Sequence, residues 1–115
     1  MARKSEFVNL VLELLAPLGP ASSRAMFGGW GIYLDGVMFA LVADDMLYFK
    51  ADDASRAEFR QAGLEPFRYV QRGKQVTFDY FSAPDEAFDA PHLMLPWARL
   101  GLAAALRARA AKTRG

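Results

Sequence analysis

The sequence contains no cysteine and a single histidine, His92, among its 115 residues. Without cysteine there is no disulfide framework, no thiolate nucleophile and no thiolate metal ligand. One histidine and no cysteine also give no basis for a Ser-His-Asp triad or for a Cys-His pair with a spare metal ligand. Ser22, Ser23 and Ser55 lie in sequences unlike a nucleophile elbow. We therefore assign no catalytic residue, no metal ligand and no cofactor, and we expect no enzymatic activity.

Long apolar runs are also missing. No run reaches the roughly 18 to 20 residues that a membrane-spanning helix needs, and the sequence does not open with a signal peptide. Glu13 interrupts the one apolar stretch near the start, residues 8–18. Hydrophobic residues make up 53% of the chain and charged residues 23%, which is typical of a globular protein. We expect one cytoplasmic domain over residues 1–115.

Basic and acidic residues nearly balance over the whole chain, but they are unevenly distributed along it. The formal net charge is +1, which gives no general reason to expect a nucleic-acid partner. After Asp89 there is no acidic residue, and the charged residues that follow are Arg99, Arg107, Arg109, Lys112 and Arg114. We interpret them as cations favourably placed at the end of a terminal helix. The alternative is a basic patch that binds nucleic acid or an acidic partner.

The most informative stretch is residues 26–50, in which short apolar runs rich in Val, Ile, Phe and Tyr are separated by turn residues. Asp35-Gly36 between two such runs is a strong hairpin signal, because a type I′ turn needs positive φ at both central residues. Asp44-Asp45 makes the next break. We predict an antiparallel meander with strands at 24–27, 30–34, 37–43 and 46–50.

Both faces of this meander are apolar. With two-residue turns, period-two alternation places Trp30, Ile32, Leu34, Val37, Phe39 and Leu41 on one face. The other face then carries Tyr33, Met38, Val42, Leu47 and Phe49. Three modest helices can cover one face of a five- or six-stranded sheet but not both. We therefore predict that the second set is an interface, most simply of a two-fold homodimer, although a different protein could bind there.

The flanking segments supply the helices and the last strands. Ser5 is a plausible N-cap for a helix over residues 6–16. Asp52 or Asp53 should cap a second helix that runs through about Ala62 and is closed by Gly63, with Ala54, Ala57 and Phe59 on its core side. Two strands, 67–71 and 75–81, and a final helix over 96–110 complete the prediction. The acidic pairs Asp44-Asp45 and Asp52-Asp53 are interpreted as turn and helix-start residues rather than as metal ligands.

Gly28, Gly29 and Gly31 form the one local feature that packing alone does not explain. The sequence is not a dinucleotide-binding fingerprint, because a strand follows it. We favour a tight turn or bulge in which only glycine fits. A second hypothesis is an anion or ligand site, in which backbone N–H groups are flanked by Arg24 and Lys50.

Several of these residues occur together in the order that is typical of one known family. The set comprises Arg24, Met26-Phe27-Gly28-Gly29, Gly31, Tyr33, Asp35-Gly36, Phe39, Asp44-Asp45, Leu47-Tyr48, Lys50, Glu65-Pro66-Phe67 and Leu95-Pro96-Trp97-Ala98. In this combination the chain resembles the N-terminal domain of the TfoX/Sxy family over about residues 7–108.

The resemblance implies a two-layer α+β domain with an antiparallel sheet and the order α-β-β-β-(β)-α-β-β-α. Longer family members are bacterial regulators of natural competence that work with the cyclic-AMP-responsive transcription activator. They carry a second, C-terminal domain that these 115 residues do not include. The family supplies no catalytic residues to transfer. We therefore expect a non-enzymatic regulatory module that contacts other proteins, with the transcription machinery as the implied partner.

Overall fold

The computed structural model describes residues 5–26 and 28–114. Its helices are α1 (Glu6–Leu15), η1 (Ala16–Leu18), α2 (Arg56–Gln61), η2 (Asp85–Asp89) and α3 (Pro91–Arg114), where η marks a 3₁₀ helix. Its strands are β1 (Ser22–Met26), β2 (Gly29–Leu34), β3 (Val37–Ala43), β4 (Met46–Lys50), β5 (Pro66–Gln71) and β6 (Lys74–Ser82). All six strands form one antiparallel sheet in the order β1-β2-β3-β4-β6-β5. The α+β class and the implied order of elements are confirmed.

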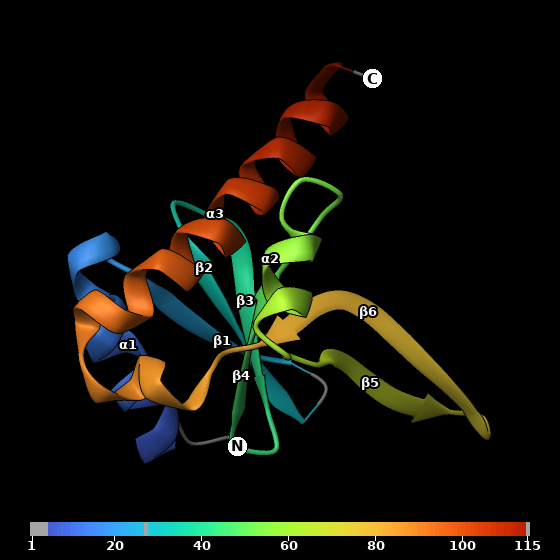
Figure 1. Ribbon diagram of the computed structural model, residues 1–115, viewed down its shortest axis with the longest axis horizontal. Coiled ribbons are helices and arrows are strands. Elements are labelled where there is room, and N and C mark those ends of the chain that lie inside the picture. The colour runs from blue at the N-terminus through green and yellow to red at the C-terminus, as the bar shows by residue number, and fades with distance from the viewer. Residues whose placement is uncertain (1–4, 27, 115) are drawn as a thin grey trace.

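The helices form a layer on one side of the sheet (Figure 1). Helix α3 packs against β3 and β4, and α1 packs against α3. The core between the layers includes Val8 and Val11 of α1, Phe39 and Phe49 of the sheet, and Met94 of α3, all fully buried. The β5–β6 hairpin extends beyond the helices (Figure 1). One face of the sheet is therefore covered by helices, and the other is not.

Both predicted two-residue turns are confirmed. Leu34 pairs with Val37 across Asp35-Gly36, and Ala43 pairs with Met46 across the second turn. The central residues have the positive φ that type I′ turns require: 51° and 77° in the first turn, and 50° and 56° in the second. The turn chemistry in the sequence therefore fixes the hairpins of the meander.

The prediction of which residues share a face was wrong beyond the middle of β3. Tyr33 pairs with Met38 and Ile32 pairs with Ala40, so Phe39 is an extra residue in β3. Such a bulge exchanges the two faces for the residues that follow it.

The bulge moves three predicted interface residues into the core. Val42, Leu47 and Phe49 are only 3%, 2% and 0% exposed. Leu41 and Tyr48, by the same exchange, turn to the uncovered side and are half-buried. Tyr33 and Met38 precede the bulge and lie on the uncovered side, as predicted.

We call this uncovered side the open face. From β1 to β4 it carries Arg24, Met26, Gly31, Tyr33, Met38, Leu41, Met46, Tyr48 and Lys50. From β5 and β6 it carries Phe67, Tyr69, Val76, Phe78 and Tyr80. Apart from Arg24 and Lys50 these strand residues are uncharged.

The predicted helices are present in the structure, but their first and last residues differ from the predicted ones. The side chain of Ser5 caps α1 by accepting a hydrogen bond from the Val8 N–H at 3.1 Å. Helix α2 begins at Arg56 because the carbonyl of Asp52 first closes a turn with the N–H groups of Ser55 and Arg56. On α2, Phe59 is buried as predicted.

Three details of these helices correct the predictions. Ala54 and Ala57, expected on the core side of α2, are exposed. Helix α3 starts at Pro91 rather than Pro96, so it contains Pro96 in its interior. The end predicted for the first strand, Phe27, lies outside the described residues.

Candidate functional site

The open face is hollowed into a groove of about 500 Å³. One wall is the turn between β1 and β2, with Met26, Gly28 and Gly29, and the floor includes Met38 and Leu41. The other wall belongs to the β5–β6 hairpin and consists of Phe67, Tyr69, Phe78 and Tyr80. Asp44 and Arg68 are the charged residues that line it. A mostly apolar cavity of this size is in the range of binding sites in general.

The hairpin wall is held together by contacts between aromatic rings. The Phe67 ring centroid lies 4.9 Å from that of Tyr48, 5.8 Å from that of Phe78 and 6.3 Å from that of Tyr69. Tyr69 and Phe78 stack with centroids 5.6 Å apart and remain 41% exposed each. Such ring pairs stabilise by more than their buried area alone. Part of this wall is therefore ordered and still accessible to a partner.

The sequence interpretation did not single out these hairpin aromatics. Phe67 and Tyr69 alternate on β5, as do Phe78 and Tyr80 on β6, so period two was the available signal. Period-two alternation shows that these aromatic residues share one face of the hairpin, but it does not show which residues of the other strands lie beside them. Only the position of the hairpin beside β4 brings its rings to the same side as Met38 and Leu41.

Two cations lie over aromatic rings of the open face. The guanidinium carbon of Arg24 is 5.0 Å from the ring centroid of Tyr33, and Lys50 Nζ is 5.2 Å from that of Tyr80. Burial raises the pKa of the Tyr80 phenol, and the nearby Tyr33 phenol raises it further. Within the described part of the chain, no ion pair involves Arg24 or Lys50. Their charges are therefore available to an acidic group of a partner.

The glycine-rich turn meets the conformational demand that was predicted for it. Gly28 has φ of +78°. A Cβ on Gly29 would lie 2.3 Å from the carbonyl oxygen of Val42. A Cβ on Gly31 would lie 2.9 Å from Met26 Sδ. Backbone geometry therefore accounts for Gly28 and Gly29 without a ligand, whereas the atoms that a Cβ on Gly31 would meet belong to side chains.

The five residues of the hypothetical anion site are not gathered at one point. Gly29 pairs with Met26 at one end of the meander, where Ala43 and Met46 also lie. Lys50 lies at the far end of β4 from Met46, beside Tyr80. Arg24 pairs with Gly31 between these ends. The structure thus places the predicted binding residues along the open face and separates Lys50 from the Gly28–Gly29 turn.

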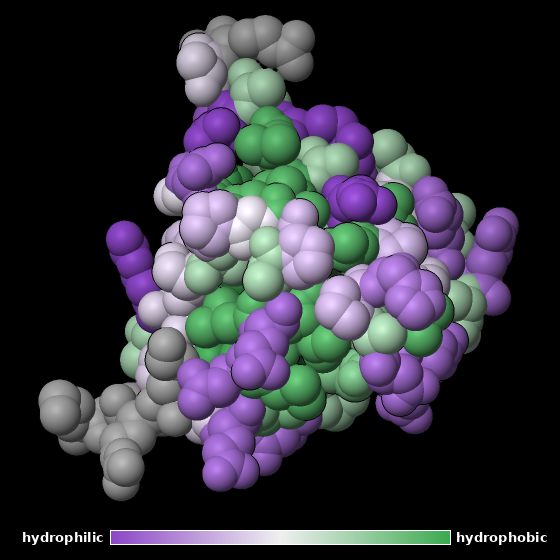
Figure 2. Space-filling view, turned by 90° about the vertical axis from the view of Figure 1, so that its left-hand side faces the viewer, coloured by the Kyte–Doolittle hydropathy of each residue, from purple (hydrophilic) through white to green (hydrophobic). Residues whose placement is uncertain are grey.

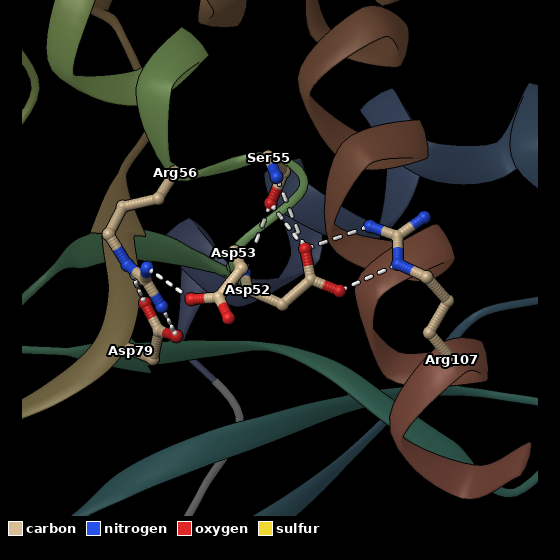
Figure 3. A network of polar contacts seen from close by, with 6 residues as sticks. All are labelled: Asp52, Asp53, Ser55, Arg56, Asp79 and Arg107. Carbon is tan, nitrogen blue, oxygen red and sulfur yellow. Dashed lines mark hydrogen bonds and ion pairs between the residues drawn. The ribbon is translucent and has the colours of Figure 1, made fainter. Parts of the chain in front are cut away.

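A polar network fixes α2 and α3 relative to β6 (Figure 3). Arg107 donates to Asp52 through Nε at 2.7 Å and a second guanidinium nitrogen at 2.9 Å. The Ser55 side chain, which is 1% exposed, also binds the Asp52 carboxylate. Arg56 joins Asp53 at 2.7 Å and Asp79 of β6 through two contacts. Hydrogen bonding from Arg107 lowers the pKa of Asp52 to about 2.

This network changes the interpretation of the basic C-terminal segment. Arg107 was one of the cations considered for nucleic-acid binding, and it is occupied by Asp52. Arg109 and Lys112 are exposed, and the side chain of Arg114 lies outside the described residues. The Arg107 charge therefore serves tertiary packing through Asp52, and fewer cations of the C-terminal segment remain to attract a nucleic acid.

The acidic residues in the described ranges do not gather into a metal-binding cluster. No cluster of three or more His, Asp or Glu side chains is suitable for holding a metal ion in the described ranges. Asp44 and Asp45 occupy a turn with positive φ, and Asp52 and Asp53 bind arginines. None of the helices described is both long and apolar enough to cross a membrane.

A second apolar area lies on the α1 side of the molecule. Figure 2 shows a band of apolar side chains through the middle of that side, bordered by polar ones. Leu10 of α1, which is 39% exposed, contributes to the outer surface of the helical layer. The open face has a groove lined by side chains of several strands, so it is the stronger candidate site.

Comparison with known proteins identifies relatives over most of the chain. The chain is 33% identical to DNA transformation protein TfoX1 of Aliivibrio fischeri over 82 residues, which cover 71% of this chain and 37% of that protein. It is 26% identical to Protein Sxy of Escherichia coli over 100 residues, covering 87% of this chain and 48% of the relative. The chain thus spans less than half the length of each. The family described as the TfoX N-terminal domain matches residues 13–105, and the chain belongs to this TfoX/Sxy family.

Proposed function

We propose that this domain is a non-enzymatic regulator of DNA transformation that acts by binding other proteins through its open face. The relative from A. fischeri is named DNA transformation protein TfoX1, and this name supports DNA transformation as the process that the domain regulates. The groove supports the mode of action, because it combines aromatic, methionine and leucine side chains with few charges. Aromatic residues and methionine are enriched at protein interfaces, whereas Lys, Glu and Asp are depleted. The groove is the observation on which the proposal rests.

Partial exposure of apolar side chains on the open face is the second support. Met46 is 48% exposed, and Tyr69 and Phe78 are each 41% exposed, on a single face. Monomeric proteins rarely leave a contiguous apolar surface of large extent uncovered. Covering these side chains with a partner would supply the free energy of binding.

Binding of nucleic acid through α3 is the weaker alternative. Its basic residues include Arg107, whose guanidinium already binds Asp52 through two contacts. Specific DNA recognition requires side chains that read base edges, typically Arg, Asn or Gln in a groove-fitting helix. Of the residue types that read base edges, α3 from Arg107 onward offers its arginines but no Asn or Gln, and only alanine and Thr113 stand between its cations.

The proposal is tested in the organism that encodes the chain. The gene would be deleted, and the deletion strain complemented with the gene for the wild type, for Phe78→Glu or for Leu106→Glu. The frequency of DNA transformation would then be measured in each strain. Phe78 is 41% exposed in the groove, whereas Leu106 is 40% exposed on α3, away from the sheet. We expect Phe78→Glu to lose complementation and Leu106→Glu to keep it. Equal complementation by both variants, at equal protein levels, would contradict a role for the groove.

A further inference from the structure

Four residues of the open face lie in one row across the sheet. Tyr33 of β2 pairs with Met38 of β3, and Lys50 of β4 pairs with Tyr80 of β6. The register between β3 and β4 brings Lys50 level with the bulge that follows Met38. Four neighbouring strands thus each contribute one residue to what we call the tyrosine–lysine row, which consists of Tyr33, Met38, Lys50 and Tyr80.

The row holds hydrogen-bond donors that no other described residue uses. The hydroxyls of Tyr48 and Tyr69, on the same face, donate to neighbouring side chains. The hydroxyls of Tyr33 and Tyr80 have no hydrogen-bond partner in the described part of the chain. Burial, and secondly the Tyr33 phenol, raise the pKa of Tyr80, so its phenol is a donor at neutral pH.

Each of these two phenols has a cation over its ring. Lys50 Nζ lies 5.2 Å from the ring centroid of Tyr80, and the guanidinium carbon of Arg24 lies 5.0 Å from that of Tyr33. Neither cation makes an ion pair with a residue that the structure describes. Since an ammonium has three N–H donors, contact with one ring leaves donors of Lys50 for an anion.

The other charges near the open face do not occupy the row. Asp35, exposed in the β2–β3 turn, makes no ion pair in the described ranges. Asp44 lies before the start of β4, whereas Lys50 is its last residue. Arg68 binds Glu65 at 3.4 Å. The ammonium and the two hydroxyls of the row are therefore left for a group from outside the described chain.

The row borders the groove and shares two residues with it. Met38 belongs to the floor and Tyr80 to the hairpin wall, whereas Tyr33 and Lys50 do not line the groove. A group bound by the row would therefore lie next to an apolar group in the groove. One ammonium and two neutral hydroxyls suit a single carboxylate, whereas a polyanion such as DNA requires several cations along its backbone.

We propose that the tyrosine–lysine row binds an Asp or Glu side chain of a partner protein, while an apolar side chain of the same segment occupies the groove. Lys50 supplies the charge, and the hydroxyls of Tyr33 and Tyr80 donate hydrogen bonds to the carboxylate. Arg24, beside Tyr33, adds a second positive charge. The donors are side chains of β2, β4 and β6, so this site differs from the anion site predicted at the glycine-rich turn. The inference rests on the proposed function, since it names the chemistry of the partner.

The first experiment compares two small probes that differ in charge alone. The acid 3-phenylpropionate carries a carboxylate close to an aromatic ring, and 3-phenylpropanamide is its neutral counterpart. NMR titration of the purified chain, followed at the Met38 methyl group, gives a dissociation constant for each. We expect the acid to bind at least about tenfold more tightly than the amide. Equal binding, or no shift of the methyl signal up to about 20 mM acid, would overturn the proposal.

Variants of the row identify the donors. Lys50→Gln should weaken the acid at least about tenfold, and Tyr33→Phe and Tyr80→Phe, which keep the rings, should each weaken it about threefold to tenfold. Binding of the amide should stay unchanged in all three, which shows that the groove is intact. Arg99→Gln removes an exposed cation of α3 and should change neither probe. Asp35→Asn, which tolerates the φ of +51°, should not weaken the acid. Equal losses in Lys50→Gln and Arg99→Gln would overturn the assignment.

The second experiment tests a protein segment as the source of the carboxylate. Peptides selected from a random library on phage with the wild type, and rejected by Lys50→Gln, should carry Asp or Glu beside an aromatic or aliphatic residue. Selected peptides without an acidic residue would overturn the proposal. A dimer of the purified chain in light scattering at about 100 μM that Phe78→Glu abolishes would also overturn it, because the chain would then cover its own open face.

The inference and the proposed function fail in different ways. Equal binding of acid and amide, with transformation lost in Phe78→Glu, would reject the carboxylate site and keep the groove as the site of the partner. Binding of the acid that depends on Lys50, with transformation unaffected by Phe78→Glu and by Lys50→Gln, would reject the regulatory role and keep the carboxylate site. Probe affinity and transformation frequency are therefore read independently.

Discussion

Gly28 and Gly29, in the turn into β2, differ in what a side chain would meet. At Gly28 there is open space, but φ is +78°, and asparagine tolerates that conformation. At Gly29 a Cβ would lie 2.3 Å from the Val42 carbonyl oxygen. We expect Gly29→Ala to destabilise by about 1 to 3 kcal/mol and Gly28→Asn to cost less than about 1 kcal/mol. Urea unfolding of the two variants measures this, and the reverse order would contradict the geometry.

The Asp52–Arg107 pair predicts a pH dependence of stability. The pKa of Asp52 falls from an ordinary value of 3.8 to about 2 in the folded chain. Its contribution is therefore fully present above pH 3.8 and is lost as the pH falls toward 2. Because the Arg107 side chain is 48% exposed, the contribution at neutral pH is at most about 1 kcal/mol.

Substitution of Arg107 tests that dependence. Arg107→Gln should be less stable than the wild type at pH 7, and the difference should shrink between pH 4 and pH 2. Arg109→Gln, on the same helix and exposed, serves as the control and should match the wild type throughout. A constant difference for Arg107→Gln over this range would show that the carboxylate charge is not what the arginine stabilises.

At the scale of the elements, the aromatic contacts predict how the β5–β6 hairpin is held. Phe67 contacts rings on β4, β5 and β6, whereas Val70 near the tip is 68% exposed. Phe67→Ala should accelerate amide hydrogen exchange in residues 66–78 more than in β2 and β3, because the hairpin loses its packing against Tyr48. Val70→Ala should leave exchange unchanged. Uniform acceleration across the sheet would instead indicate global destabilisation.

Local signals in the sequence were sufficient for the elements but not for the faces of the sheet. Asp35-Gly36 and Asp44-Asp45 determine turns through their own backbone preferences. The first and last residues of β3 and β4 were therefore predicted correctly. The extra residue Phe39 leaves no local signal, because every neighbouring residue is also apolar. A bulge in such a run is decided by the packing of Phe39 and Ala40 under α3. That tertiary choice moved Val42 from the predicted interface into the core.

Long-range contacts also decided the extent of the helices and part of the candidate site. An uncovered apolar face was predicted, because both faces of the meander were apolar and the helices were few. The hairpin wall of the groove was not predicted, because Phe67 reaches Tyr48 only through the pairing of β4 with β6. Likewise, Asp52 and Arg107 are 55 residues apart in sequence, and nothing local predicts that they pair.

At the scale of the whole molecule, the charge balance argues against DNA recognition by α3. The net charge of +1 provides little long-range attraction for a polyanion, and Asp52 already neutralises Arg107. Cations that contact only phosphates would give binding that is weak, independent of sequence and steeply dependent on salt. A gel-shift titration at about 150 mM salt should therefore show no sequence-dependent binding below about 1 μM.

The comparison of two variants makes that result specific to α3. Arg109→Ser with Lys112→Ser removes exposed cations, whereas Arg99→Ser removes an exposed cation nearer the start of the same helix. If residual binding at low salt is electrostatic only, both changes should weaken it in proportion to the charge removed. Submicromolar, sequence-dependent binding that is lost only in the Arg109 and Lys112 variant would contradict this expectation. It would then place a nucleic-acid site on α3, opposite the open face of the sheet.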